Sequence, residues 1–111
     1  MEKKFILVFD GVMKAQLKGL GKEESTRKIL SKMFDKMESL GPRAGELIDS
    51  HIFLYEIKSK SPPLRLYYMH VKKTDELYVF EYEMKTSKKK QQKTIIKLKK
   101  KSKQIRNQDL F

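Results

Sequence analysis

A chain of 111 residues has the length of one protein domain, so we expect residues 1–111 to form a single domain. The chain has no cysteine, which excludes disulfides and thiolate metal sites. It also has no apolar segment near the ~20 residues that span a bilayer, so we expect a cytoplasmic protein with no membrane partner. The formal net charge is +12, and residues 84–111 carry 11 basic side chains against one acid, Asp109. This surplus at one end indicates a polyanion binder, with a solvated lysine face as the alternative.

The first half of the chain predicts a strand followed by two helices. Residues 3–9 are apolar and rich in strand-forming types, and Asp10-Gly11 ends them. Residues 12–20 have helical spacing, and a second helix is expected from Glu23 and Glu24 to Leu40, where Gly41-Pro42 follows. We expect these helices to form a hairpin on one face of a sheet.

The second half predicts three strands and a final helix. Residues 52–58, 64–71 and 77–84 are rich in aromatic and aliphatic types, and the short loops between them favour antiparallel neighbours. Thr86 or Ser87 is a candidate cap for a basic C-terminal helix. The order β-α-α-β-β-β-α predicts an α+β fold with a mostly antiparallel sheet, one face of which is covered by the helical hairpin and the other open.

Strand alternation assigns the side chains of the three strands to two faces. The predicted core face consists of Phe53, Tyr55, Ile57, Leu64, Leu66, Tyr68, Tyr78, Phe80, Tyr82 and Met84. The predicted open face consists of Glu56, Lys58, Arg65, Tyr67, Met69, Glu81, Glu83 and Lys85. Such an open face offers phosphate-binding cations and proton-transfer groups together, but ordinary cross-strand pairs of Glu and Lys are the alternative.

Arg65 is the most informative single residue, because it is one of four arginines and lies in an otherwise apolar and aromatic strand. A guanidinium suits bidentate recognition of phosphate, whereas a structural pair with Glu56 or Glu81 is an equal alternative. Other chemistries have little support. His51 and His70 do not form a metal-ligand spacing, so we expect no metal and no cofactor, and the chain has no glycine-rich phosphate loop.

The order of these segments resembles the RelE/HigB superfamily of toxins from type II toxin–antitoxin modules, in particular its HigB-like, phage-derived branch. Residues 54–58 (Leu-Tyr-Glu-Ile-Lys) are similar to one strand of that family. Residues 64–68 (Leu-Arg-Leu-Tyr-Tyr) are similar to the next. Residues 78–80 followed by 85–89 (Lys-Thr-Ser-Lys-Lys) resemble the last strand and the start of the last helix.

The resemblance implies a RelE/ParE-like fold and an endoribonuclease that cleaves mRNA, on the ribosome or free, without metal, and so inhibits translation. The implied partners are mRNA, the ribosome and a cognate acidic antitoxin. In the catalytic centre it implies Arg65 as the stabiliser of the phosphate, Glu56 and Lys58 as base or charge support, and Lys85 as a basic group. The residues implied or expected to bind RNA are Lys60, Tyr67, Lys88, Lys89, Lys90 and Lys93.

The chain departs from the family pattern near its C-terminus, where no tyrosine or histidine follows Tyr82 to stack a base or to transfer a proton. Two non-catalytic functions therefore remain open. One is a ParE-like inhibitor of DNA gyrase, and the other is an RNA- or DNA-binding module without catalysis.

Overall fold

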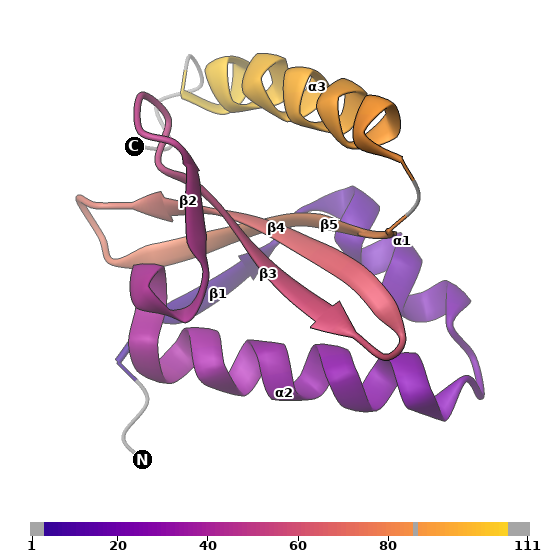
Figure 1. Ribbon diagram of the computed structural model, residues 1–111. Helices are drawn as coiled ribbons and strands as arrows, with labels where there is room; N and C mark the ends of the chain where they lie inside the picture. Colours follow the sequence, from indigo (N-terminus) through magenta and orange to yellow (C-terminus); the bar gives the residue numbers. More distant parts are fainter. Residues whose placement is uncertain (1–3, 86, 107–111) are drawn as a thin grey trace.

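The structure is a computed structural model that describes residues 4–85 and 87–106. A five-stranded sheet has helices on both faces (Figure 1). The elements in chain order are β1 (Ile6–Phe9), α1 (Gly11–Gly19), α2 (Glu24–Leu40), the short 3-10 helix η1 (Gly41–Ala44), β2 (Glu46–Asp49), β3 (Leu54–Lys60), β4 (Pro63–Val71), β5 (Glu76–Met84) and α3 (Lys88–Arg106). The strand order is β1-β5-β4-β3-β2, with β1 parallel to β5 and all other pairs antiparallel. The predicted α+β class and the β3-β4-β5 meander are confirmed.

The helical hairpin begins and ends where the sequence predicts. Asp10 caps α1, because its Oδ2 accepts a 2.8 Å hydrogen bond from the backbone N–H of Val12. At the other end of the hairpin, Gly41 has φ +60° and lies against the ring of Phe5, where a Cβ would come within 2.4 Å of the ring. A glycine is therefore required at the point where α2 turns into η1.

Strand β2 is absent from the sequence-based prediction. It is only four residues long and pairs with β3 from Leu54 to Glu56, with an irregularity between Leu47 and Asp49. So short a segment, with a glutamate and an aspartate at its ends, lacks the alternation that marks a strand. It extends the sheet by one strand beyond β3.

The first hydrophobic cluster lies between the sheet and the helical hairpin, as predicted. Met13 of α1 and Leu30, Met33 and Met37 of α2 pack against buried residues of the sheet. Those sheet residues are Ile57, Leu64, Leu66, Tyr68, Leu77 and Val79. The apolar stripe that the sequence shows along α2 is therefore the contact of this helix with the sheet.

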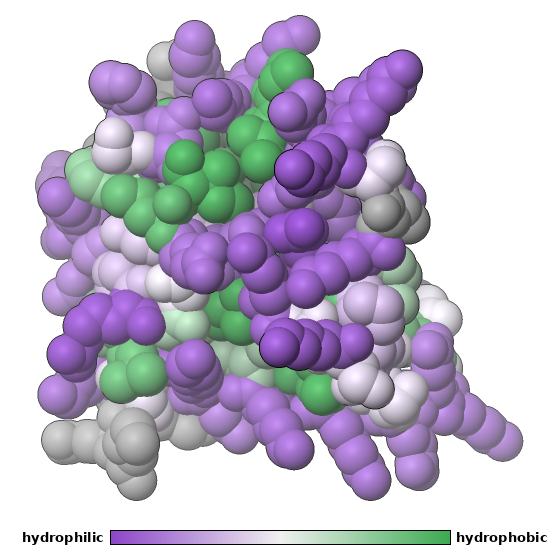
Figure 2. Space-filling view, viewed as in Figure 1, coloured by the Kyte–Doolittle hydropathy of each residue, from purple (hydrophilic) through white to green (hydrophobic). Residues whose placement is uncertain are grey.

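The second hydrophobic cluster shows that the other face of the sheet is not open. Helix α3 lies across that face (Figure 1) and packs Leu98 and Ile105 against buried residues of the sheet and the β2–β3 turn. Those residues are Ile52, Leu54, Tyr67, Met69 and Phe80. Figure 2 shows the largest group of hydrophobic atoms on this side of the molecule between β2 and the C-terminal half of α3, with smaller groups below it among mostly hydrophilic side chains. The expectation of an open face is therefore wrong.

Part of the predicted core face is wrong, because β5 contains an irregularity. Tyr67 pairs with Glu81, but Tyr68 pairs with Val79, so β5 has one extra residue at Phe80. As a result Tyr78 and Phe80 pack in the second cluster under α3, while Tyr82 packs against the first. Two further residues assigned to the core lie elsewhere: Met84 is exposed, and the ring of Phe53 lies 4.0 Å from the Lys72 ammonium.

Within the described residues, no helix combines the length and the apolar composition needed to cross a membrane.

Candidate nucleic-acid interface

Arg65 lies on β4, directly between Lys58 of β3 and Glu83 of β5 in the register of the sheet. Its Nη1 donates to both carboxylate oxygens of Glu56, at 3.2 and 3.3 Å. The Arg65 side chain is 20% exposed, and among the described residues only Nη1 has a hydrogen-bond partner. The pair with Glu56 thus fixes the guanidinium and leaves Nε and Nη2 able to bind an anion.

Glu56 is surrounded by donors. Besides Arg65, its carboxylate lies 3.4 Å from Lys58 Nζ and accepts a 3.3 Å hydrogen bond from Gln91 Nε2 on α3, and the residue is 5% exposed. Both oxygens of this carboxylate are therefore engaged by donors of the protein. The carboxylate is well placed to orient the groups that bind it.

Lys58 has a second carboxylate partner, Glu46 of β2, at 3.3 Å. The hydrogen bond to Glu46 raises the pKa of Lys58, and the charge and hydrogen bond of Glu56 raise it further. A lysine with a raised pKa stays protonated at neutral pH. Of the two roles that the sequence allows for Lys58, the geometry therefore favours charge support over proton acceptance.

Tyr67 is fully buried beneath α3. Its hydroxyl donates to Glu83 Oε1 at 2.6 Å, and the other oxygen of Glu83 accepts a 2.7 Å hydrogen bond from Thr94 of α3. Burial, followed by the hydrogen bond to Glu83, raises the pKa of Tyr67 well above its usual range. Tyr67 can contact RNA only where α3 has moved away from the sheet.

The predicted basic residues fall into two groups. Lys85 follows β5 directly, with its backbone N–H donating to the Pro63 carbonyl at 2.9 Å, and α3 begins three residues later. Ser87 caps that helix by accepting from the Lys90 N–H at 3.2 Å, whereas Thr86 lies outside the described residues. The exposed lysines at the start of α3 are Lys88, Lys89, Lys90 and Lys93. Lys60 is exposed at the end of β3, two residues after Lys58.

Three other lysines of α3 bind carboxylates of the sheet and its loops. Lys97 Nζ lies 2.9 Å from Glu81, Lys99 Nζ lies 2.9 Å from Asp49, and Lys101 Nζ lies 2.6 Å from Asp10. Glu81 therefore pairs with Lys97, and Glu56 is the partner of Arg65, which decides between the two structural pairs that the sequence allowed. Part of the basic surplus holds α3 to the protein.

Asp10 joins three separate segments of the chain through its carboxylate. It accepts hydrogen bonds from Lys101 and from the Tyr78 hydroxyl, both at 2.6 Å, in addition to the Val12 N–H. Burial by itself would raise the pKa of Asp10, but these three donors outweigh it, and the pKa lies below its usual value. Sequence reasoning missed the contacts made by Asp10, Asp49, Gln91 and Thr94, because each joins segments far apart in the chain.

The histidines do not gather with this group. His70 Nε2 lies 3.2 Å from Asp75 Oδ1, and His51 is exposed in the turn before β3. Across residues 4–85 and 87–106, no group of three or more His, Asp or Glu side chains is arranged to hold a metal ion.

The comparisons with known proteins show the fold. The isolated RelE toxin of E. coli superposes with a TM-score of 0.58 at 21% identity, over 80% of this chain and 94% of RelE. RelE in the intact E. coli RelBE toxin–antitoxin complex gives 0.57 at 21% identity, over 74% and 98%. A double arginine-to-alanine variant of E. coli RelE bound to a RelB peptide gives 0.59 at 19% identity, over 82% and 94%. The chain has the RelE fold.

Beyond these structures, the scan against protein-family models and the search of curated proteins found no match. The predicted RelE-like architecture is therefore confirmed by structure. The narrower assignment to the HigB-like branch stays a prediction.

Proposed function

We propose that this protein is the toxin of a type II toxin–antitoxin module and cleaves mRNA as a metal-independent endoribonuclease in the cytoplasm. The observation that carries the proposal is the Arg65 centre on a RelE fold. A partly exposed guanidinium, held by a buried carboxylate and flanked by a second cation, occupies the sheet beside the basic start of α3. The E. coli RelE structures, free and bound to the antitoxin RelB, support the toxin assignment.

In the proposed reaction the 2′-hydroxyl of the substrate gives its proton to solvent water and attacks the adjacent phosphorus. The 2′-O–P bond forms, the P–O5′ bond breaks, and the products carry a 2′,3′-cyclic phosphate and a 5′-hydroxyl. Arg65 uses its remaining donors, with the ammonium of Lys58, to stabilise the negative charge of the pentacovalent phosphate. Glu56 keeps both cations in position. Within residues 4–85 and 87–106 the Lys85 ammonium has no hydrogen bond or ion pair, and it supplies the proton for the leaving 5′-oxygen.

The exposed lysines at the start of α3 hold the RNA backbone. Lys88, Lys89, Lys90 and Lys93 provide point charges without a base-stacking ring, so they add affinity without sequence preference. The same surface suits ribosomal RNA, which supports mRNA on the ribosome as the substrate. The antitoxin is expected to be acidic, because it must cover a chain with a net charge of +12.

Expression of the chain without its antitoxin tests the proposal. Growth should stop, and cellular mRNA should show cleaved ends with a 5′-hydroxyl. Cleavage of free RNA by the purified protein should be unchanged by EDTA. Arg65→Ala should abolish both effects while the circular dichroism spectrum is kept. Arg27→Ala is the matched control, since Arg27 is exposed on α2 and its guanidinium donates to the Gly21 carbonyl, far from Arg65 in the sequence. Cleavage by Arg65→Ala at the wild-type rate would show that the centre is misplaced.

One observation favours a second, non-catalytic function. Residues 83–111 contain no tyrosine or histidine, and Glu56, the carboxylate that binds Arg65, already accepts from three donors. A site with little capacity for proton transfer suits a ParE-like gyrase inhibitor or a simple nucleic-acid-binding module. A DNA supercoiling assay beside the RNA assay separates them: inhibited supercoiling with intact RNA identifies the gyrase inhibitor, and binding without either effect identifies the module.

A further inference from the structure

The outer edge of β3 is unpaired over half of its length. Strand β2 covers β3 only from Leu54 to Glu56, whereas β3 continues to Lys60. On the inner side, residues 57–60 pair with β4, and no strand in the described part of the chain pairs with their outer side. The backbone N–H and C=O groups that point outward there are free to receive another strand.

A groove lies along this edge, between β3 and α2. Two adjoining cavities of about 350 and 230 Å³ share Lys36, Ile57 and Lys58 in their linings. The floor is apolar and consists of Ile29, Met33 and Ile57, and the rim carries Lys32, Lys36, Arg43 and Lys58. The exposed acid in the linings is Glu46, so the rim is basic. We call this the α2–β3 groove.

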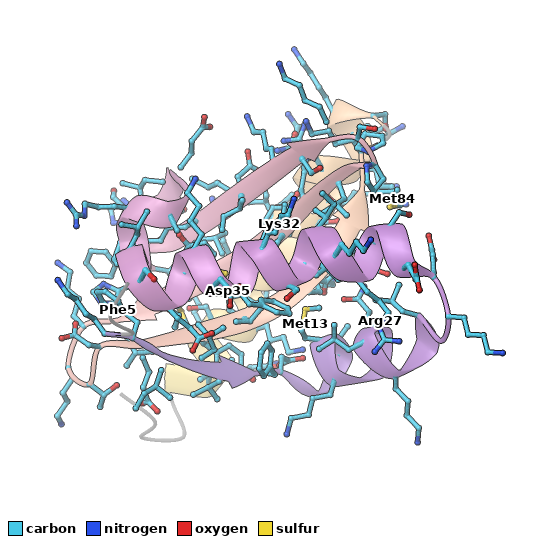
Figure 3. The ribbon with its side chains drawn as sticks, turned by 90° about the horizontal axis from the view of Figure 1, so that it is seen from below. Phe5, Met13, Arg27, Lys32, Asp35 and Met84 are labelled. Atoms are coloured by element: carbon cyan, nitrogen blue, oxygen red, sulfur yellow. The ribbon has the colours of Figure 1, made fainter. Side chains whose placement is uncertain are left out.

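The opposite side of α2 has the opposite character. Figure 3 shows Lys32 and Asp35 on different sides of the helix, with Asp35 on the side of Phe5. A cavity of about 750 Å³ there runs along β1, the strand at the other edge of the sheet, and its lining includes Asp35 and Glu38. Helix α2 therefore separates a basic groove at one edge of the sheet from a groove at the other whose rim carries Asp35 and Glu38 against one lysine, Lys4.

We propose that the α2–β3 groove binds an extended acidic peptide segment, which pairs with residues 57–60 and adds a strand to the sheet. In such a strand alternate side chains point the same way, about 7 Å apart. One set of side chains would enter the apolar floor, and the other would face the basic rim. Lys32 and Lys36 are four residues apart, about 6 Å along the helix, which matches the spacing of acidic side chains on one side of the strand.

The lining favours a peptide over RNA. No aromatic side chain lines either cavity, so the groove has no ring on which a base could stack. An open strand edge and an apolar floor are the features by which sheets capture peptides. The identification of this peptide with part of the antitoxin rests on the proposed function. The preference of the groove for an acidic strand does not.

The test uses the full chain and a fluorescein-labelled nine-residue peptide of alternating glutamate and valine, with an alternating lysine and valine peptide as the charge control. Fluorescence anisotropy should show the acidic peptide binding, and K32E/K36E should weaken that binding at least tenfold. The matched control K14E/K18E makes the same charge change at the same spacing on α1, where both lysines are exposed. It should change the affinity less than twofold.

Hydrogen exchange locates the bound strand, because the peptide should protect backbone amides within residues 57–60. A peptide with proline in place of the central valines should not bind, since it cannot pair along the edge. An equal loss in the two charge-reversal pairs would overturn the proposal, and so would protection along β1 instead of β3. Loss of oligouridylate binding in K32E/K36E with peptide binding unchanged would assign the groove to RNA and also overturn it. Arg65→Ala should bind the peptide as wild type does, so this result is independent of the nuclease assay.

Discussion

Removal of the Glu56 carboxylate should destabilise the protein and misplace Arg65. Glu56 is 5% exposed and accepts from Arg65, Lys58 and Gln91. Breaking a fully buried ion pair costs about 3–5 kcal/mol, but Arg65 is 20% and Lys58 40% exposed, so water can solvate both cations when the carboxylate is gone. We expect Glu56→Ala to lower the free energy of unfolding by about 2–3 kcal/mol and Glu56→Gln by about 1–2 kcal/mol, since the amide oxygen still accepts from Arg65.

Urea denaturation of Glu56→Ala, Arg65→Ala and the double variant forms a cycle that isolates their coupling. We expect a coupling energy of about 1–2 kcal/mol, with Met13→Ala, in the hydrophobic cluster on the other face of the sheet, as a partner that adds to either variant independently. A coupling below about 0.3 kcal/mol would refute the pair as an energetic unit. In the RNA assay, Glu56→Gln should cleave more slowly with an unchanged pH–rate profile. Loss of the acidic limb of that profile would instead identify Glu56 as the base.

Three further predictions concern α3 and the charges around it. Asp10→Ala should lower the free energy of unfolding by about 2–4 kcal/mol, because it removes a helix cap and the partner of Lys101. Since the pKa of Asp10 is lowered in the folded state, its stabilisation is present above the unfolded pKa of about 3.9 and lost as the pH falls toward the lowered value, so the variant and wild type should converge in acid denaturation. Leu98→Ala should cost about 2–4 kcal/mol by thermal or urea unfolding, because Leu98 is fully buried between α3 and the sheet. K89Q/K93Q should weaken binding to a single-stranded RNA and reduce the log–log salt slope by about 1.4, and an unchanged slope would show that these lysines do not contact phosphate.

Long segments with a clear period were predictable from the sequence. Helix α2 ends at Leu40, where Gly41 adopts a conformation that few other residues tolerate, and the three strands of the meander keep their expected order. Two features were not predictable. The four-residue β2 is held by its pairing with β3, and the extra residue at Phe80 changes which face the first half of β5 presents. Both depend on a partner strand, and a single sequence does not show the register of that partner.

The Arg65 centre was predictable only in part. Alternation alone places Glu56, Lys58 and Arg65 on one face of the sheet. Glu56 and Lys58 are two residues apart on β3, and Arg65 lies directly across from Lys58 on β4. It does not place Gln91 beside Glu56 or Thr94 beside Glu83, since those contacts depend on where α3 lies. The sequence does not show how α3 packs on the sheet, because the lysines that bind carboxylates of the sheet and its loops cannot be told from the exposed ones by sequence alone.

The structure separates these two kinds of lysine by the face of α3 that they occupy. Lys97, Lys99 and Lys101 bind carboxylates along the margins of the contact with the sheet. Lys89 and Lys93 lie one turn apart and exposed, and Lys100 and Lys103 continue along the same outer side of the helix. The inward charges neutralise acids that would otherwise repel a polyanion. The outward charges are free to attract one, and the helix brings their N-terminal end beside Arg65. One basic helix thus completes the fold on one side, and under the proposed function its other side would concentrate RNA at the Arg65 centre.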